Sequence, residues 1–192
     1  DKAKPITNEG PDTYTYDPAN AAPFIWSYSV DSGGPDNYEE VDARSDVLVY
    51  ETGVSEDTLT VCGPITATVY AATSANDTDW VARISLVHPS GYVQRLTEGW
   101  VRARFRNGLF KNELVQPGIV EQYKIDLWGT AVEVRPGYAL RLSITSSTFP
   151  LLARNLNTGG DITNETNPVV ASQTIYHNTI YSSYVTLPIL AK

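Results

Sequence analysis

Short runs of alternating hydrophobic and polar residues cover most of the chain, and each run ends at a turn. The pattern is clearest in residues 65–72 (ITATVYAA), 123–127 (YKIDL) and 140–145 (LRLSIT). Period-two alternation is typical of a β-strand with one buried face and one face in water. Pro136-Gly137 favours a turn, because proline presets φ and glycine leaves it free. These runs predict antiparallel sheets with one solvated face.

Further runs of the same kind complete the predicted architecture. They lie at residues 23–30, 46–52, 59–62, 80–88, 92–96, 100–108, 172–177 and 183–190. Roughly nine to eleven strands without a long helix predict an all-β fold, a two-sheet antiparallel sandwich of the jelly-roll kind. Residues 1–22 are polar and contain prolines, so we expect an arm or linker there and the sandwich domain in residues 23–192.

Composition and charge narrow the classes of partner. Hydrophobic residues make up 42% of the chain and charged residues 19%, which is enough to form a core. The net charge of −8 argues against a nucleic-acid partner, which would require a basic surface. Apolar runs are too short to span a membrane, and no signal peptide is visible. We expect a soluble bacterial protein, with cytoplasmic and exported locations both open.

Two further features concern the origin and redox chemistry of the chain. The single cysteine, Cys62, cannot form an internal disulfide, and we expect a buried, inert thiol. The chain contains no methionine and begins DKAKPITNEG. We therefore expect an excised or processed piece of a larger protein.

The residues give no support for catalysis, metal binding or a cofactor. A nucleophile elbow requires G-x-S-x-G, and the nearest string, residues 53–57 (GVSED), lacks the second glycine. The two histidines, His88 and His177, are interpreted as surface or packing residues. Residues 155–160 (NLNTGG) lack the aspartates of a calcium loop, so an asparagine-rich turn that caps backbone groups is the better interpretation.

Three arginines alternate with apolar residues near the end of one predicted strand. Arg102, Arg104 and Arg106 would share one face of residues 100–108. One hypothesis is a solvated strand face that offsets acidic residues on a neighbouring strand. The other is an ion-paired interface with a second domain, since arginine suits interfacial carboxylates.

Aromatic residues alternate in the first predicted strand. Phe24, Trp26 and Tyr28 would place three rings on one face. Packing in the core is the default interpretation. A sugar-stacking platform and a contact surface for a partner domain are the alternatives.

Several segments, taken in order, resemble one enzyme family. They are ARSDVLVYET, GPITATVYAATSANDTDWVARISLVHPSG, LTEGWVRARFRNG, SSTFPLLARNLNTG and QTIYHN…SYVTLPIL, with PG…Y.IDLW…V.RPG..LRL.I between them. Together they resemble the C-terminal domain of the X-Pro dipeptidyl-peptidase and cocaine-esterase type of serine hydrolase, over residues 42–190. Thr148 and Ala153 depart from the family, which usually has Asn and Asp there.

The resemblance implies a fold, a partner and candidate sites. It implies a jelly roll of the galactose-binding-like type that packs on a separate α/β-hydrolase domain of the same protein. That domain carries the catalytic Ser-Asp-His set, so no catalytic residue transfers to this chain. Trp26 and Tyr28 are implied, by position, in the wall of the substrate pocket. The candidates for a domain interface are Arg102, Arg104, Arg106, Arg154, Asn155 and Asn157.

Three hypotheses follow from the sequence. The first is a non-catalytic accessory domain that docks on a serine hydrolase domain and helps to wall its pocket. The alternative is a carbohydrate-binding module, and the third is a structural domain that forms homo-oligomers.

Overall fold

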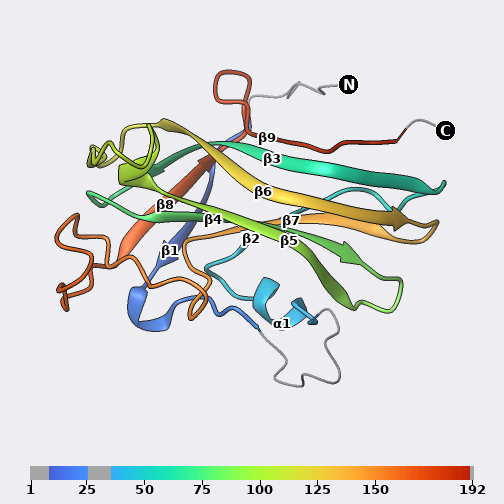
Figure 1. Cartoon of the computed structure of the whole chain (residues 1–192), viewed down its shortest axis with the longest axis horizontal. Helices are drawn as coiled ribbons and strands as arrows, with labels where there is room; N and C mark the ends of the chain where they lie inside the picture. Colours follow the sequence, from blue (N-terminus) through green and yellow to red (C-terminus); the bar gives the residue numbers. More distant parts are fainter. Residues whose placement is uncertain (1–8, 26–35, 191–192) are drawn as a thin grey trace.

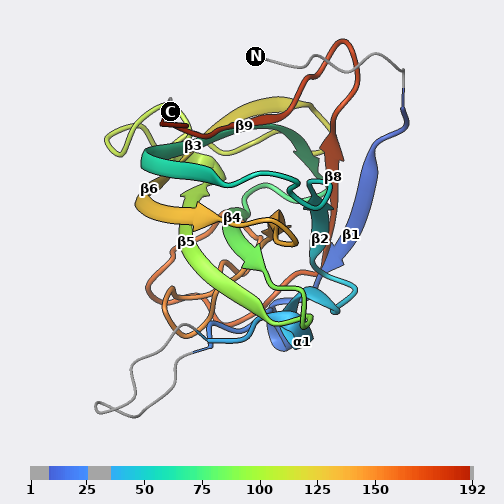
Figure 2. The ribbon, with the colours of Figure 1, turned by 90° about the vertical axis from the view of Figure 1, so that its right-hand side faces the viewer.

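Two antiparallel sheets face each other and enclose one core. The computed structural model describes residues 9–25 and 36–190. One sheet has the order β1 (Asp12–Tyr16), β8 (Ala171–Tyr176), β3 (Leu59–Thr73), β6 (Glu121–Val134), with β9 (Tyr184–Thr186) also paired to β3. The other has the order β2 (Leu48–Glu51), β7 (Ala139–Thr145), β4 (Asp79–Val87), β5 (Val93–Arg102). Figures 1 and 2 show the two layers, which confirm the predicted antiparallel sandwich.

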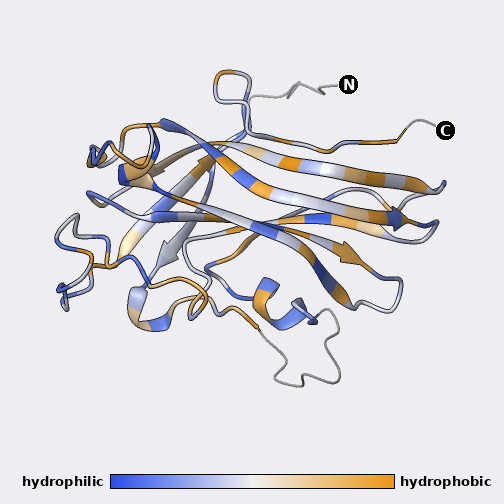
Figure 3. Cartoon of the chain, viewed as in Figure 1, coloured by the Kyte–Doolittle hydropathy of each residue, from blue (hydrophilic) through white to orange (hydrophobic). Residues whose placement is uncertain are grey.

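The alternating runs supply the core as predicted. In β3, Ile65 is fully buried and Val69 is 1% exposed. In β6, Tyr123 and Ile125 are buried, whereas Lys124 between them is exposed. The alternation along β6 is visible as bands of contrasting hydropathy in Figure 3. Burial of these apolar side chains between the sheets is the main stabilising contribution expected for such a fold.

The N-terminal segment is part of the sandwich, which corrects the predicted arm. β1 pairs with β8 from Asp12 opposite Ile175 to Tyr16 opposite Ala171. Tyr16 is fully buried and belongs to the main core. The prediction failed because only one short alternating stretch marks this strand in a polar segment.

The second sheet does not have the solvated outer face that we predicted. Ser143 and Thr145 of β7 are buried, although they alternate with core residues. The short helix α1 (Glu39–Asp42) lies against this face and covers it (Figure 1). In the first sheet Thr68 is also buried rather than exposed.

The two sheets come into contact along β5 and β6. A Cβ atom on Gly99 would lie 1.9 Å from the backbone oxygen of Asp126, so only glycine fits at this position. The Thr97 hydroxyl donates a hydrogen bond to the Leu127 carbonyl beside it. The turn predicted at Pro136-Gly137 is present, with Gly137 at φ 88°.

Other local predictions require correction. β5 ends at Arg102, and the chain continues as a short 3-10 helix, η2 (Ala103–Phe105), not as a strand. The other short helices are η1 (Pro18–Asn20) and α1. Cys62 is exposed, not buried, because Val61 beside it occupies the inward position of β3.

The predicted first strand falls largely outside the described residues, which end at residue 25 and resume at residue 36. Within the described part, Pro23 forms an isolated bridge with Phe149. Among the residues described, no helix has both the length and the apolar character required to cross a bilayer.

Candidate functional site

Three segments of the family resemblance meet at one end of the sandwich. They are residues 77–80 at the start of β4, residues 102–106 after β5, and the loop of residues 149–167, all at the left in Figure 1. Hydrogen bonds connect each of the three segments to the others. The site is therefore assembled from parts of the chain far apart in sequence.

The first two arginines of the predicted stripe form ion pairs within the chain. Arg102 donates hydrogen bonds to both carboxylate oxygens of Asp79, from Nε at 2.8 Å and from Nη2 at 2.9 Å. The Nε atom of Arg104 lies 2.6 Å from Asp77 Oδ2, and Arg104 is only 4% exposed. The predicted pairing with an acid on the neighbouring strand is confirmed for Arg102. The predicted solvated face is wrong for Arg104, because η2 turns this side chain inward.

Asn155 joins the two carboxylates. Its Nδ2 atom donates to Asp77 Oδ2 and to Asp79 Oδ1, each at 2.9 Å. Burial and the nearby Asp77 charge raise the pKa of the Asp79 carboxyl, and the hydrogen bonds from Arg102 and Asn155 act in the opposite direction. The hydrogen bond to Asp79 in turn raises the pKa of Arg102. Burial is the largest of these effects, so the pKa of Asp79 is raised overall, while its donors Arg102 and Asn155 favour the charged carboxylate.

The rest of the loop is organised as the predicted asparagine-rich turn. Asn155 Oδ1 accepts a hydrogen bond from the Asn157 amide at 2.9 Å, and Asn157 has a φ of 66°. Asn157 Nδ2 donates to the Val169 carbonyl at 2.6 Å. Within the described residues no cluster of three or more potential metal-ligating His, Cys, Asp or Glu side chains is found.

Arg106 and Arg154 occupy the edges of this region. Arg106 donates to the Glu113 carbonyl at 2.6 Å and lies 3.4 Å from the Glu121 carboxylate. Arg154 donates to the Pro18 carbonyl at 2.7 Å, and its guanidinium lies 4.8 Å from the centre of the Phe149 ring. Side chains proposed for a domain interface are thus already hydrogen-bonded inside the chain. Their role toward a second domain stays a prediction.

An apolar hollow opens beside this polar network. It has a volume of about 380 Å³. Its lining includes Trp100, Val101, Leu109 and Leu152, with Arg102 at one side. A second hollow of about 240 Å³ is lined by Phe149 and Ile162 among others, and Ala153 contributes to both hollows. The end of the sandwich therefore combines a rigid polar interior with an apolar surface.

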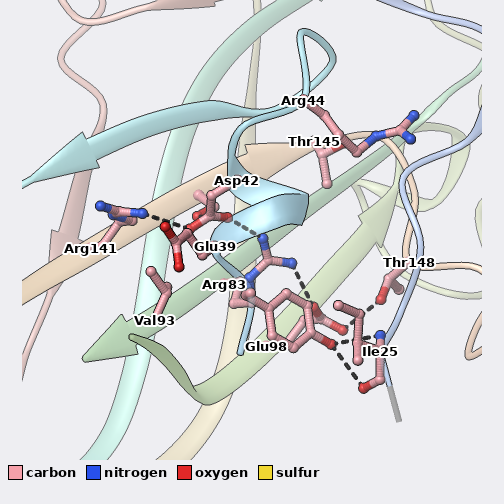
Figure 4. Close-up of polar contacts among 12 residues, drawn as sticks. Ile25, Glu39, Asp42, Arg44, Arg83, Val93, Glu98, Arg141, Thr145 and Thr148 are labelled. Atoms are coloured by element: carbon pink, nitrogen blue, oxygen red, sulfur yellow. Dashed lines mark hydrogen bonds and ion pairs between the residues drawn. The ribbon is translucent and has the colours of Figure 1, made fainter. Parts of the chain in front are cut away.

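A second buried ionic cluster lies beneath α1, and the sequence analysis did not identify it. Arg83 of β4 is 1% exposed and donates to Asp42 Oδ1 at 2.6 Å (Figure 4). The Nη1 atom of Arg83 lies 3.5 Å from Glu98 Oε2. Ser143 and Arg141 donate to the same Asp42 carboxylate, at 2.8 Å and 3.2 Å. An arginine inside the apolar run WVARISLV was the available signal, because such a residue requires a buried acid.

This cluster extends to the segment that precedes Trp26. The Arg83 guanidinium lies 4.2 Å from the centre of the Tyr38 ring. The Tyr38 hydroxyl accepts a hydrogen bond from the Ile25 amide at 3.0 Å and donates one to the Ile25 carbonyl at 3.2 Å. Phe24 donates its amide to the Phe149 carbonyl at 2.7 Å. Trp26 and Tyr28, the predicted pocket-wall residues, lie outside the described residues.

The two histidines have different surroundings. His88 bonds to Gln94 at 2.8 Å and packs on tyrosine rings, as predicted for a packing residue. His177 Nε2 lies 3.0 Å from Asp12 Oδ2. Ser183 lines the same small hollow as His177, but its hydroxyl accepts from the Tyr70 amide and donates to the Tyr176 carbonyl. That hydroxyl is therefore committed to the backbone and unsuited to nucleophilic attack.

Comparison with known proteins agrees with the resemblance. Residues 2–186 match the family model described as "X-Pro dipeptidyl-peptidase C-terminal non-catalytic domain". The chain is 33% identical to a cocaine esterase from Rhodococcus sp. (strain MB1 Bresler) over 189 residues, which covers 96% of this chain and 33% of the esterase.

Two solved structures have the same fold over nearly the whole chain. An aminopeptidase from a marine sediment archaeon, Thaumarchaeota archaeon, superposes with a TM-score of 0.91 at 28% identity, covering 98% of this chain and 34% of that protein. An α-amino acid ester hydrolase superposes with a TM-score of 0.91 at 24% identity, again over 98% of this chain and 34% of the other. The chain thus spans about a third of the length of the relatives that it matches.

Proposed function

Because the chain belongs to the family of X-Pro dipeptidyl-peptidase C-terminal non-catalytic domains, we propose that it is the accessory domain of a larger serine hydrolase. In this proposal it docks on an α/β-hydrolase domain of the same polypeptide and helps to wall the substrate pocket. The substrates belong to the acyl, ester or X-Pro peptide class. The observation that carries the proposal is coverage: the match spans nearly all of this chain but only a third of the esterase.

The chemistry of the described residues supports a non-catalytic role. His88 is hydrogen-bonded to Gln94, and the Ser183 hydroxyl near His177 is bonded to backbone groups. In the candidate site the Arg104–Asp77 ion pair is buried and the Arg102–Asp79 ion pair is partly buried. Such groups fix loops in place and offer no nucleophile or general base to a substrate.

The pocket-wall role is supported by how the chain is anchored before Trp26. The Ile25 backbone is bonded twice to the Tyr38 hydroxyl, and Phe24 is bonded to Phe149. Residues 24 and 25, which directly precede Trp26, are therefore held against the sandwich. The pocket-wall role of Trp26 itself stays a proposal from the family resemblance.

Activity measurements on two proteins test the proposal. The chain alone should show no saturable turnover of nitrophenyl esters or X-Pro-naphthylamides. The full polypeptide should show turnover that a serine-directed inhibitor abolishes. In that polypeptide, Trp26→Ala should raise KM for bulky acyl substrates more than for acetyl esters, because it removes part of the pocket wall.

Two outcomes would contradict it. Inhibitor-sensitive turnover by the chain alone would disprove the non-catalytic role. Unchanged kinetics for Trp26→Ala and Tyr28→Ala on every substrate size would disprove the pocket-wall role while leaving the accessory role intact.

A further inference from the structure

We propose that the apolar surface beside the end of β5 is the face that docks on the hydrolase domain. We define this docking face by Trp100, Leu109, Phe110 and Leu151, together with the hollow of about 380 Å³ that Trp100 and Leu109 line. The proposal rests on the function proposed above and specifies which part of the sandwich makes the contact. It differs from the arginine interface predicted from the sequence.

Exposure of large apolar side chains is the first observation. Phe110 is 103% exposed and Leu109 is 81% exposed, so neither side chain is covered by the chain itself. Trp100 and Leu151 are 39% and 45% exposed. Trp100 and Leu109 line the same hollow, and Phe110 follows Leu109 in the chain, so exposed apolar side chains gather there as is typical of an interaction site.

The shape of the surface is the second observation. Trp100, Leu109 and Leu152 line one hollow, which is mainly apolar. Phe149 and Ile162 line the next, together with the charged side chains of Arg104, Arg154 and Glu165. The shared residue, Ala153, makes the two hollows neighbours. An interface core needs concave apolar surface into which a partner's side chains can pack, and this end of the sandwich provides it.

The rigidity of the underlying loops is the third observation. Arg102, which lines the first hollow, is held by two hydrogen bonds to Asp79 and by one to the Ala153 carbonyl at 3.3 Å. Arg104, in the turn after β5, binds the Gly160 carbonyl at 3.0 Å. Arg102 and Arg104 thus connect residues 102–106 to the loop that carries Leu151. A preorganised surface loses less entropy on docking.

Two arguments identify the hydrolase domain as the occupant. The relatives are about three times as long as this chain, so a further domain of the same polypeptide is expected to need an apolar face here. The docking face also continues into Phe149, which is bonded to Phe24 and bridged to Pro23. Phe149 also lines the second hollow, so the described residues that precede Trp26 lie beside this end of the sandwich.

Hydroxyl-radical footprinting of the full polypeptide and of this chain alone tests the proposal. Oxidation of Phe110 should fall by about tenfold in the full polypeptide, because the core of an interface is packed like a protein interior. Oxidation of Trp100 and Leu151 should fall as well. Trp128 and Ile180, which are 66% and 75% exposed on other parts of the sandwich, serve as internal controls and should not change.

A paired substitution makes the test independent of the wild-type footprint. In the full polypeptide, Leu109→Ser combined with Phe110→Ser should restore oxidation of Trp100 to its value in the chain alone. The matched variant Ile180→Ser should leave it unchanged. Both variants alter exposed side chains, so the fold of the sandwich should persist, as far-UV circular dichroism can verify.

The outcomes separate this inference from the proposed function. Protection of Trp128 or Ile180 without protection of Phe110 would overturn the docking face but keep a docked domain. Equal oxidation of all these residues in both proteins would overturn docking itself. If Phe110 in the chain alone becomes more protected as the protein concentration rises, the docking face binds a second copy of this chain instead.

Discussion

Asn155 shows how one neutral side chain can hold two like charges together. Asp77 and Asp79 are 0% and 4% exposed, and their carboxylates would repel each other in a medium of low polarity. Each has its own arginine, and Asn155 donates a hydrogen bond to both. The asparagine therefore completes a set of buried charges that would be costly if any member lacked a partner.

Substitution of Asn155 should consequently be more destabilising than its size suggests. Asn155→Ala should lower the free energy of unfolding by about 1–3 kcal/mol, because two buried carboxylates each lose a donor. Urea unfolding followed by tryptophan fluorescence measures the change. Asn164→Ala, an exposed asparagine of the same loop, is the control and should change stability by less than about 0.5 kcal/mol. Equal effects for the two variants would contradict the structural role of Asn155.

The thiol of Cys62 gives a second test at the residue scale. Since Cys62 is exposed on β3 and is the only cysteine, one thiol per chain should react with Ellman's reagent without denaturant. Reaction only after unfolding would show that the outward face of β3 is covered. The Cys62→Ser variant supplies the blank.

At the scale of elements, α1 depends on charges supplied by the sheet beneath it. The helix has four residues, too few to be stable alone. Its last residue, Asp42, accepts hydrogen bonds from Arg83 on β4 and from Ser143 on β7. The helix is therefore attached to the middle of the second sheet by a buried ionic contact, and it covers that sheet in return.

Removal of the acid should detach the helix and expose the arginine. Asp42→Ala should destabilise the protein by about 3–5 kcal/mol, because Arg83 would keep only the longer contact with Glu98. Guanidinium unfolding gives the free energy. Glu39→Ala, on the exposed side of the same helix, is the matched control and should have an effect below about 0.5 kcal/mol. A loss below about 1 kcal/mol for Asp42→Ala would mean that water solvates Arg83.

These elements also show what the sequence could reveal. The alternation in β3 and β6 predicted their buried residues, because one face of each strand is in the core and the other is largely in water. The same rule failed for β4 and β7, because their outer face is covered by residues distant in sequence. Asp42 lies 41 positions from Arg83 and 101 from Ser143, and no local pattern reports such a contact.

The candidate site was predicted to a similar extent. Arg102 and Asn155, which were named as interface candidates, meet in one network within the chain, and their role toward a second domain stays a prediction. The predicted asparagine-rich turn is present, with Asn155 Oδ1 accepting from the Asn157 amide. Their partners Asp77 and Asp79 lie 76 to 78 positions from Asn155, so the buried network could not be derived from spacing. The apolar docking face was missed as well, because Leu109 and Phe110 follow a turn and belong to no alternating run.

At the scale of the whole molecule, buried polar networks fix the loops around the sandwich, and the most exposed large apolar side chains, Leu109 and Phe110, follow the end of β5. The main core contains buried residues from both sheets, and a smaller apolar cluster that includes Tyr38 and Val41 lies at α1. The ionic networks lie outside the main core, at the outer face of the second sheet and at the end of β5. We expect such a domain to fold on its own and to contact a larger domain through the exposed apolar surface proposed above.

Buried tyrosines in both layers make the stability of the whole sandwich sensitive to alkali. Burial raises the pKa of Tyr123 from 10.0 to about 12, and it also raises the pKa values of Tyr14, Tyr16, Tyr38 and Tyr50. Above pH 10 the unfolded chain therefore releases protons that the folded chain retains. The free energy of unfolding should be unaffected by these groups below about pH 10 and should fall between about pH 10 and pH 12.

An absorbance titration at 295 nm with parallel circular dichroism measures this linkage. Ionisation of the buried set should coincide with loss of the β-sheet signal, since water can reach these hydroxyls only when the sheets separate. In denaturant all twelve tyrosines should titrate together. Tyr123→Phe should reduce the slope of stability against pH above pH 10, because one linked proton is removed. Complete ionisation of the tyrosines by pH 11 with the sheet signal intact would show that the core admits hydroxide without unfolding, contrary to the packing described here.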